Sequence, residues 1–140
     1  MLKVVLDTNV IVSANLNVQG MEALVVRLAS NKVIQLCISP PILAEYENVL
    51  KRPKFKFAPE LVEGVLQLIR DTGLLLTDLP VLKVLADGKD NCFLECAQAA
   101  GASYLVTGNT RHFPAKWKTT RRVTARELLE IIGPELLAGR

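Results

Sequence analysis

Short apolar runs rich in β-branched residues alternate along the chain with longer segments whose apolar residues recur at helical spacing. This alternation limits the possible folds more than any other feature, because it is typical of a parallel sheet covered by helices on both faces. We therefore predict an α/β fold: a Rossmann-like three-layer α/β/α architecture with a central, mostly parallel sheet of four to five strands. The predicted strands lie at residues 2–6, 33–38, 74–77 and 103–107, with a short fifth strand at 121–123. The predicted helices lie at residues 21–29, 40–50, 59–72, 90–100 and 124–132.

The length of the chain and its last segment predict one domain. A chain of 140 residues is close to the usual size of a single domain. Thr124 and Glu127 have the spacing of a capping box at the start of the last predicted helix, and Gly133 and Pro134 are expected to end it. We therefore predict that the domain covers residues 1–134 and that residues 135–140 form a short tail.

The composition excludes several classes of protein. Hydrophobic residues make up 50% of the chain and charged residues 22%, which argues against intrinsic disorder. No stretch reaches the ~18 uncharged apolar residues of a membrane helix, and no convincing signal-peptide cleavage site follows the apolar run at residues 4–6. We therefore expect a cytoplasmic protein without a membrane partner. The formal net charge of +3 permits a polyanionic partner without requiring one. The 3 cysteines show no zinc-site pattern and are predicted to be buried, reduced thiols.

Four polar residues fall where the predicted elements place the functional edge of such a sheet. Asp7 directly follows the first strand, and Asn109 follows the fourth. Asp90 starts the helix after the third strand, and Glu45 flanks the apolar stripe of the helix at residues 40–50. Because ligand sites of parallel sheets lie at the carboxyl ends of the strands, we expect these side chains to converge on one crevice.

Carboxylates gathered in one crevice need a counter-charge, and a hard cation supplies it. Mg²⁺ binds through a few carboxylates, waters and substrate phosphate, and Mn²⁺ accepts similar ligands. Each residue also has a structural interpretation. Asp7 would be a solvated carboxylate at a strand end, Asp90 a helix cap, and Glu45 a surface glutamate.

Four segments of the sequence, taken together and in order, resemble the PIN-domain family, in particular the branch of toxins from toxin–antitoxin modules. Each contributes one of the polar residues described above, and together they span most of the chain. The segments are VVLDTNVIVS at residues 4–13, SPPILAEY at 39–46, DGKDNCFLECA at 87–97 and YLVTGNTRHF at 104–113.

The resemblance implies an endoribonuclease that depends on Mg²⁺ or Mn²⁺. An activated water would attack the RNA phosphodiester in line and leave a 5′-phosphate and a 3′-hydroxyl. It further implies an antitoxin protein as partner and makes a homodimer plausible. The implied metal ligands are Asp7, Glu45 and Asp90, which form the catalytic set together with Asn109; the implied supporting residues are Thr8, Asn9, Ser13 and Asp87.

One departure from the family pattern keeps an alternative open. Many PIN nucleases have a fourth acidic residue where this chain has Asn109, and an amide adds no charge for a metal. The alternative is a catalytically weak or inactive PIN-like domain that binds RNA or a protein. A third interpretation is a phosphotransferase with an aspartyl nucleophile, resembling the haloacid dehalogenases. It would need a second aspartate where Asn9 stands, so we rank it lowest.

Two basic stretches are candidates for RNA contacts. The stretch after Asn109 is either a phosphate-binding surface or a solvated face. Its predicted RNA-binding residues are Arg111, Lys116, Lys118, Arg121 and Arg122. In the other stretch, at residues 51–57, basic residues alternate with Phe55 and Phe57. These rings would either stack on RNA bases or anchor the loop to the core.

Overall fold

The central sheet has six strands in the order β3-β2-β1-β4-β6-β5 in the computed structural model, which describes residues 1–138. Neighbouring strands are parallel except for the antiparallel pair β5–β6. The strands are β1 (Lys3–Leu6), β2 (Gln35–Ile38), β3 (Leu74–Leu75), β4 (Tyr104–Val106), β5 (Lys116–Trp117) and β6 (Thr120–Val123).

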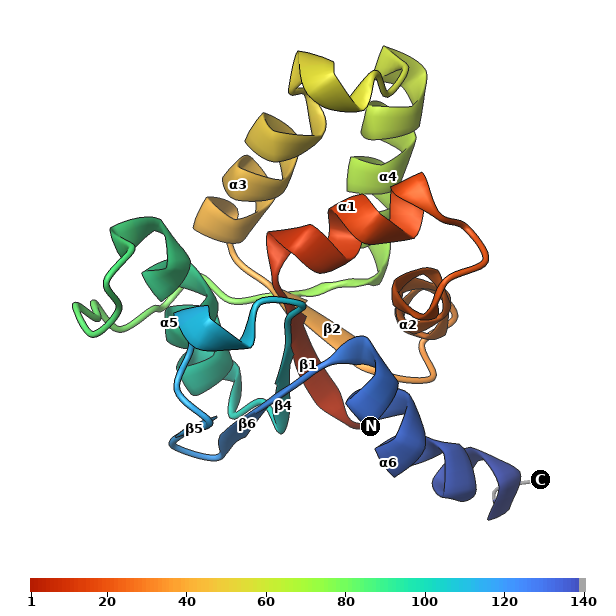
Figure 1. The fold of residues 1–140 in the computed structure, drawn as a ribbon. Coiled ribbons are helices and arrows are strands. Elements are labelled where there is room, and N and C mark those ends of the chain that lie inside the picture. The colour runs from red at the N-terminus through yellow and green to blue at the C-terminus, as the bar shows by residue number, and fades with distance from the viewer. Residues whose placement is uncertain (139–140) are drawn as a thin grey trace.

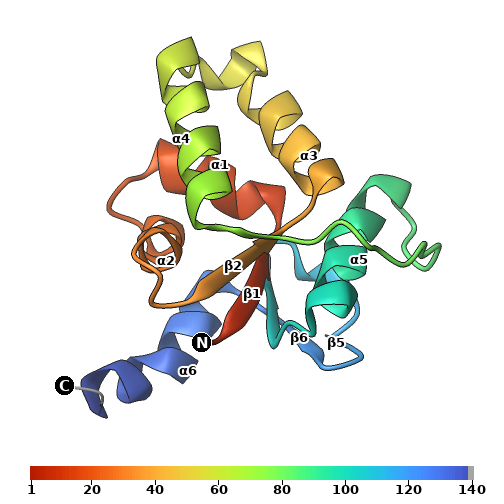
Figure 2. The same cartoon turned by 180° about the vertical axis from the view of Figure 1, so that it is seen from behind.

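Helices cover both faces of this sheet (Figures 1 and 2). On one face α5 contacts β1, β2 and β4, and on the other α6 contacts β4, β6 and α2. The predicted three-layer architecture with a mostly parallel sheet is thereby confirmed, but the sheet has one strand more than the four to five predicted, the two-residue β5. The helices are α1 (Thr8–Leu16), α2 (Met21–Ser30), α3 (Pro40–Leu50), α4 (Pro59–Thr72), α5 (Asn91–Ala100) and α6 (Ala125–Ala138). Three short 3₁₀ turns are η1 (Pro53–Phe55), η2 (Gly88–Asp90) and η3 (Thr110–His112).

The core is built around β1, which lies between β2 and β4. Val4, Val5 and Leu6 are fully buried, as expected of a parallel strand covered on both faces. Three aromatic rings extend this core toward the end of β1. Tyr46 on α3 packs against Phe93 on α5, with ring centroids 6.5 Å apart, and Phe93 meets Phe113 edge to face at 6.2 Å. These rings anchor three elements beside the carboxyl ends of the strands.

Two helices differ from the sequence prediction. Helix α1 begins at Thr8, directly after β1, in a stretch for which no helix was predicted. Helix α6 does not end at Gly133 and Pro134 but continues through Pro134 to Ala138, so that prediction was wrong. Pro134 is exposed, so the helix carbonyl that loses its N–H partner can bond to water instead. The domain limits, 1–134 with a tail at 135–140, stay a prediction, and residues 139–140 lie outside the described part.

No helix within residues 1–138 is both long and apolar enough to cross a membrane. The three cysteines are all unpaired: Cys37 and Cys96 are buried, and Cys92 is half-buried. Burial raises the pKa of the Cys37 thiol to about 11 and the pKa values of the other two to about 12. The thiols are therefore neutral at physiological pH, as expected of structural cysteines.

Candidate active site

The four predicted catalytic residues line one cleft at the carboxyl ends of β1 and β4. The cleft has a volume of about 340 Å³. Asp7 enters it from the end of β1, Glu45 from α3, Asp90 from the end of η2, and Asn109 from the loop after β4. The parallel topology therefore brings together residues that are up to about a hundred positions apart in the sequence.

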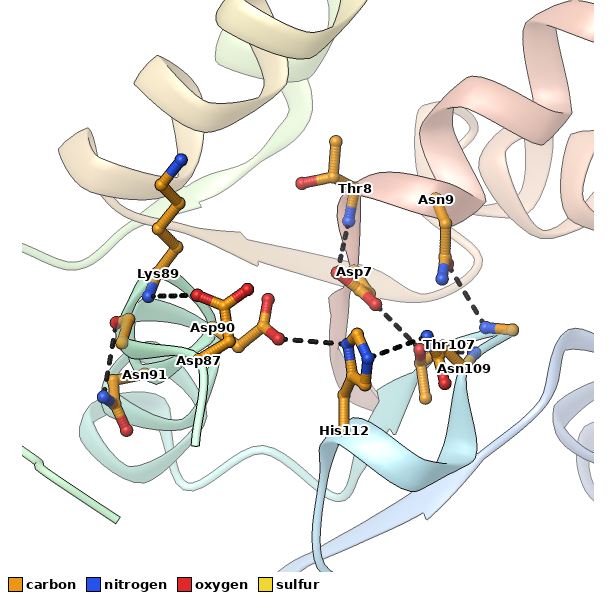
Figure 3. A network of polar contacts seen from close by, with 12 residues as sticks. Asp7, Thr8, Asn9, Asp87, Lys89, Asp90, Asn91, Thr107, Asn109 and His112 are labelled. Atoms are coloured by element: carbon orange, nitrogen blue, oxygen red, sulfur yellow. Dashed lines mark hydrogen bonds and ion pairs between the residues drawn. The ribbon is translucent and has the colours of Figure 1, made fainter. Parts of the chain in front are cut away.

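Asp7 is fixed in orientation by two hydrogen bonds (Figure 3). Its Oδ1 accepts from the backbone N–H of Thr8 at 2.8 Å, which caps α1, and its Oδ2 accepts from the Thr107 hydroxyl at 2.8 Å. The hydroxyl of Tyr46 donates to the carbonyl of Leu6 at 2.5 Å and so ties α3 to the end of β1. Only 7% of Asp7 is exposed, so its carboxylate is nearly buried with both oxygens already oriented.

Burial and mutual repulsion make negative charge costly in this cleft. Burial raises the pKa of Asp7 above its usual value, the bonds from Thr107 and Thr8 partly offset this, and the charge of Asp90 raises it further. The pKa of Asp90 is also raised, first by burial, then by the charge of Asp87, with a smaller contribution from Glu45. A cation in the cleft would relieve this repulsion.

Asp90 is held less firmly than Asp7. Its Oδ2 is buried and accepts no hydrogen bond of good geometry from the residues described. Nδ1 of His112 lies 3.2 Å from this oxygen (Figure 3). The other ring nitrogen of His112, Nε2, lies 3.0 Å from the side-chain nitrogen Nδ2 of Asn109. His112 therefore lies between two of the predicted catalytic residues, a position that its sequence context did not indicate.

Three of the four predicted supporting residues, Thr8, Asn9 and Ser13, line the cleft. The Asn9 side chain accepts a hydrogen bond from the N–H of Gly108 at 3.2 Å and links α1 to the loop after β4. Asp87 does not line the cleft; its side chain accepts from the N–H of Lys89 and caps η2.

Sequence reasoning missed Thr107, the residue that directly fixes Asp7. It is fully buried, donates to Asp7 and accepts from the N–H of Asn109 at 3.0 Å. The feature that could have identified Thr107 is the register of β1 against β4. Leu6 pairs with Val106, so the residues that follow them, Asp7 and Thr107, are neighbours.

The oxygen donors of the cleft suit a hard cation bound through few protein ligands. Within residues 1–138, no three His, Cys, Asp or Glu side chains form a ready metal cage. Mg²⁺ does not need one, because it is commonly held by one or two carboxylates together with waters and substrate phosphates. The Oδ2 of Asp90, which lies 3.2 Å from a ring nitrogen of His112, and the two carboxylates with raised pKa values fit that pattern.

None of the five predicted RNA-binding residues lines this cleft. Arg111 and Lys116 line a neighbouring hollow of about 660 Å³, which shares Asp90 and His112 with the cleft. Arg122 is occupied, since its guanidinium donates to the carbonyls of Thr110 and Phe113 at 2.6 and 2.7 Å.

Lys118 and Arg121 lie toward the opposite end of the sheet. Arg121 pairs with Tyr104, the first residue of β4, and Lys118 lies in the turn that precedes β6. Of the described Lys and Arg residues, only Arg52, just after α3, lines the cleft itself.

Two comparisons with known proteins concern the fold of the chain. The profile of the PIN domain matches residues 3–111. The chain is also similar in structure to a chain from the crystal structure of VapBC2 from Rickettsia felis bound to a DNA fragment from their promoter. The TM-score is 0.57, with 18% sequence identity over 88% of this chain and 98% of that chain. At that identity the likeness concerns the fold alone. No curated protein matches the chain significantly.

Proposed function

Because this chain belongs to the PIN-domain family, whose members are generally nucleases, we propose that it is an endoribonuclease that depends on Mg²⁺ or Mn²⁺. The observation that carries the proposal is the single cleft lined by Asp7, Glu45 and Asp90. The pKa values of Asp7 and Asp90 are raised by burial and by neighbouring carboxylates, as is common at functional sites.

In this proposal Asp7 and Asp90 hold the cation, and Glu45 either binds it directly or orients the attacking water. A bound divalent cation supplies positive charge at the phosphate and makes water a better nucleophile. The chain's own residues keep the site in order. Thr107 and the N–H of Thr8 fix the plane of the Asp7 carboxylate.

Hydrolysis would add the water oxygen to phosphorus and break the bond from phosphorus to the 3′ oxygen. The 3′ oxygen leaves as a hydroxyl after taking a proton, and the phosphate stays on the 5′ side of the next nucleotide. Asn109 contributes an amide where many relatives have a carboxylate, so the site carries one negative charge fewer. This favours a site that holds a single cation.

We further propose that the protein acts as the toxin of a toxin–antitoxin pair and that its antitoxin covers the cleft. The fold similarity to a chain of VapBC2, a complex bound to promoter DNA, supports this role. A homodimer remains a second prediction, tested by measuring the mass of the purified protein in solution. The alternative of an inactive RNA- or protein-binding domain rests on the missing charge at Asn109.

The direct test is cleavage of a labelled single-stranded RNA pool with Mg²⁺ or Mn²⁺, with EDTA as the negative condition. Asp7→Asn and Asp90→Asn should each lower the rate at least about 100-fold, since metal-assisted stabilisation is worth several kcal/mol. Asp71→Asn, which changes an exposed carboxylate on α4, is the matched control and should cleave like the wild type.

Two results would contradict the proposal. Full cleavage by Asp7→Asn would show that the cleft is not the active site. Full cleavage by the wild type in EDTA would show that the reaction needs no divalent cation. Folded wild-type protein that binds RNA but cleaves none of the pool with either metal would favour the inactive binding domain.

A further inference from the structure

The short segment that follows α3 forms one side of the proposed catalytic cleft. Arg52 and Phe55 both line it, next to Glu45 and Asp90. We propose that Arg52 and Phe55 hold the nucleotide next to the scissile phosphate, the guanidinium on its phosphate and the phenyl ring on its base. This inference rests on the proposed ribonuclease function and adds two positioning residues to it.

Helical spacing explains why Arg52 faces the cleft. Glu45, Val49 and Arg52 follow one another at intervals of four and three residues, which places them along one side of α3 and its end. All three line the cleft. The backbone after α3 is also fixed, because the N–H of Arg52 donates to the carbonyl of Val49 and the N–H of Phe55 donates to the carbonyl of Arg52.

The guanidinium of Arg52 is available for an anionic ligand. Arg52 is exposed, and its guanidinium lies within ion-pair distance of no Asp or Glu in the described part of the chain. An unpaired arginine beside carboxylates that would hold a cation suits a phosphate that bridges the two charges.

Phe55 offers a stacking surface that its own neighbours hold in place. Its ring stacks on that of Phe57, with centroids 5.7 Å apart and an angle of 18° between the planes. Both rings are half-buried and pack against the core, so the sequence hypothesis of a loop anchor also holds. The ammonium of the exposed Lys54 lies over the Phe55 ring, 5.1 Å from its centroid, so a base that stacks there would take the place of this side chain and keep its positive charge close by.

These features together favour an unpaired nucleotide as ligand. Bases of single-stranded RNA stack on aromatic side chains, and basic residues nearby bind the backbone. A base inside a duplex would already be stacked and could not use the ring.

The first experiment measures binding without cleavage, by fluorescence anisotropy of a labelled single-stranded RNA in EDTA. Arg52→Ala should lower the slope of log affinity against log salt by about 0.7, the value of one phosphate contact on a single strand. Phe55→Leu should lower affinity about tenfold and leave the slope unchanged, while Phe55→Tyr, which keeps the ring, should bind like the wild type. Arg70→Ala on α4 removes an equal charge outside the cleft and should leave the slope unchanged.

The second experiment varies the RNA and compares the wild type with Phe55→Leu. Single abasic nucleotides are placed at successive positions of one substrate. One position should cost the wild type about tenfold in affinity and cost Phe55→Leu almost nothing, since the stacking partner is already gone. Such coupling between the abasic position and Phe55→Leu would show that the ring stacks on that base, because a variant that is only less stable would be affected by abasic sites as the wild type is. In cleavage assays the same variants should raise KM more than they lower kcat.

The outcomes separate this inference from the proposed function. Loss of affinity in Arg52→Ala and Phe55→Leu supports the inference even if no metal gives cleavage. Cleavage and binding equal to the wild type in both variants would overturn it and leave the nuclease proposal standing. An abasic scan without coupling to Phe55, or no RNA binding at all, would also overturn it.

Discussion

Asp7 and Asp90 face the same cleft, but the protein holds them in different ways. Asp7 follows the three fully buried residues of β1, and its two oxygens accept hydrogen bonds from the N–H at the start of α1 and from the hydroxyl of the buried Thr107. Asp90 ends a 3₁₀ turn, and its buried Oδ2 is approached by the ring of His112 at 3.2 Å without a hydrogen bond of good geometry.

The approach to Asp90 is a long irregular segment tied down by a few polar side chains. Residues 76–87 contain no helix or strand. Asn91 accepts from the N–H groups of Val84 and Leu85 and donates to the carbonyl of Gly88, and Glu95 accepts from the N–H of Leu82. One proposed metal ligand therefore adjoins the core, whereas the position of the other depends on two side chains of α5. We therefore expect the Asp7 side to determine the geometry of the proposed site and the Asp90 side to adjust when a cation binds.

The largest effect on cleavage should come from a change that disturbs the Asp7 side, the fixed side of the cleft. Thr107→Val keeps the shape of the side chain but removes the hydroxyl that bonds to Asp7 and receives the N–H of Asn109. Loss of a residue that orients a metal ligand typically costs 10–100-fold, so we expect cleavage to fall by about that factor.

A matched control for this change is Thr119→Val, which removes a hydroxyl bonded to Ala102, away from the cleft. Equal cleavage rates for the two valine variants would show that Asp7 does not need Thr107. The idea of a fixed side would then have to be abandoned.

The contrast between the two sides also explains what could be predicted from the sequence. The end of β1 was predictable, because a buried β-branched strand followed by an aspartate has one usual place in a parallel sheet. The convergence of Glu45 and Asp90 followed from the same topology. Thr107 needed the register of β1 against β4, which no local pattern contains.

The basic residues show more clearly what could not be predicted from the sequence. From composition alone, the stretches at residues 51–57 and 111–122 were both candidates for RNA contacts. Their roles separate only through tertiary contacts, since Arg122 bonds two loop carbonyls while Arg52 follows α3 into the cleft. The spacing of Glu45, Val49 and Arg52 was a usable signal, but only once Glu45 was known to face the site. The local sequence also does not show that Pro134 lies on the exposed side of α6, where the freed helix carbonyl can bond to water.

An intermediate effect is expected from a change that loosens the Asp90 side, the adjustable side of the cleft. Asn91→Ala removes the three hydrogen bonds that hold residues 84–88, and Asn91 is only 8% exposed, so its partners would lose contacts that water cannot fully replace. We expect about 2 kcal/mol lower stability in urea unfolding and faster amide exchange confined to residues 82–88. Asn48→Ala changes an exposed asparagine on α3 and is the control. Exchange that rises equally around Asp7 would show that the two sides are not independent.

The smallest effect, and the finest test of the comparison, is the pH dependence of stability without metal. Burial raises the pKa of Asp7 above its usual value of 3.8 in the folded state. The folded state therefore binds this proton more tightly than the unfolded chain, and the contribution of Asp7 to stability is fully present below pH 3.8. It is lost as pH rises through the higher folded pKa.

In EDTA, the melting temperature of the wild type minus that of Asp7→Asn should fall as pH rises above about pH 4, because the asparagine variant has no proton to lose. Asp90→Asn should show the same trend with a smaller amplitude, because Asp90 is more exposed than Asp7. Addition of Mn²⁺ at pH 7 should recover the lost stability in the wild type and not in Asp7→Asn. Parallel curves for the wild type and Asp7→Asn would mean that the Asp7 carboxylate is not under electrostatic strain. The main physical reason for a cation in this cleft would then be gone.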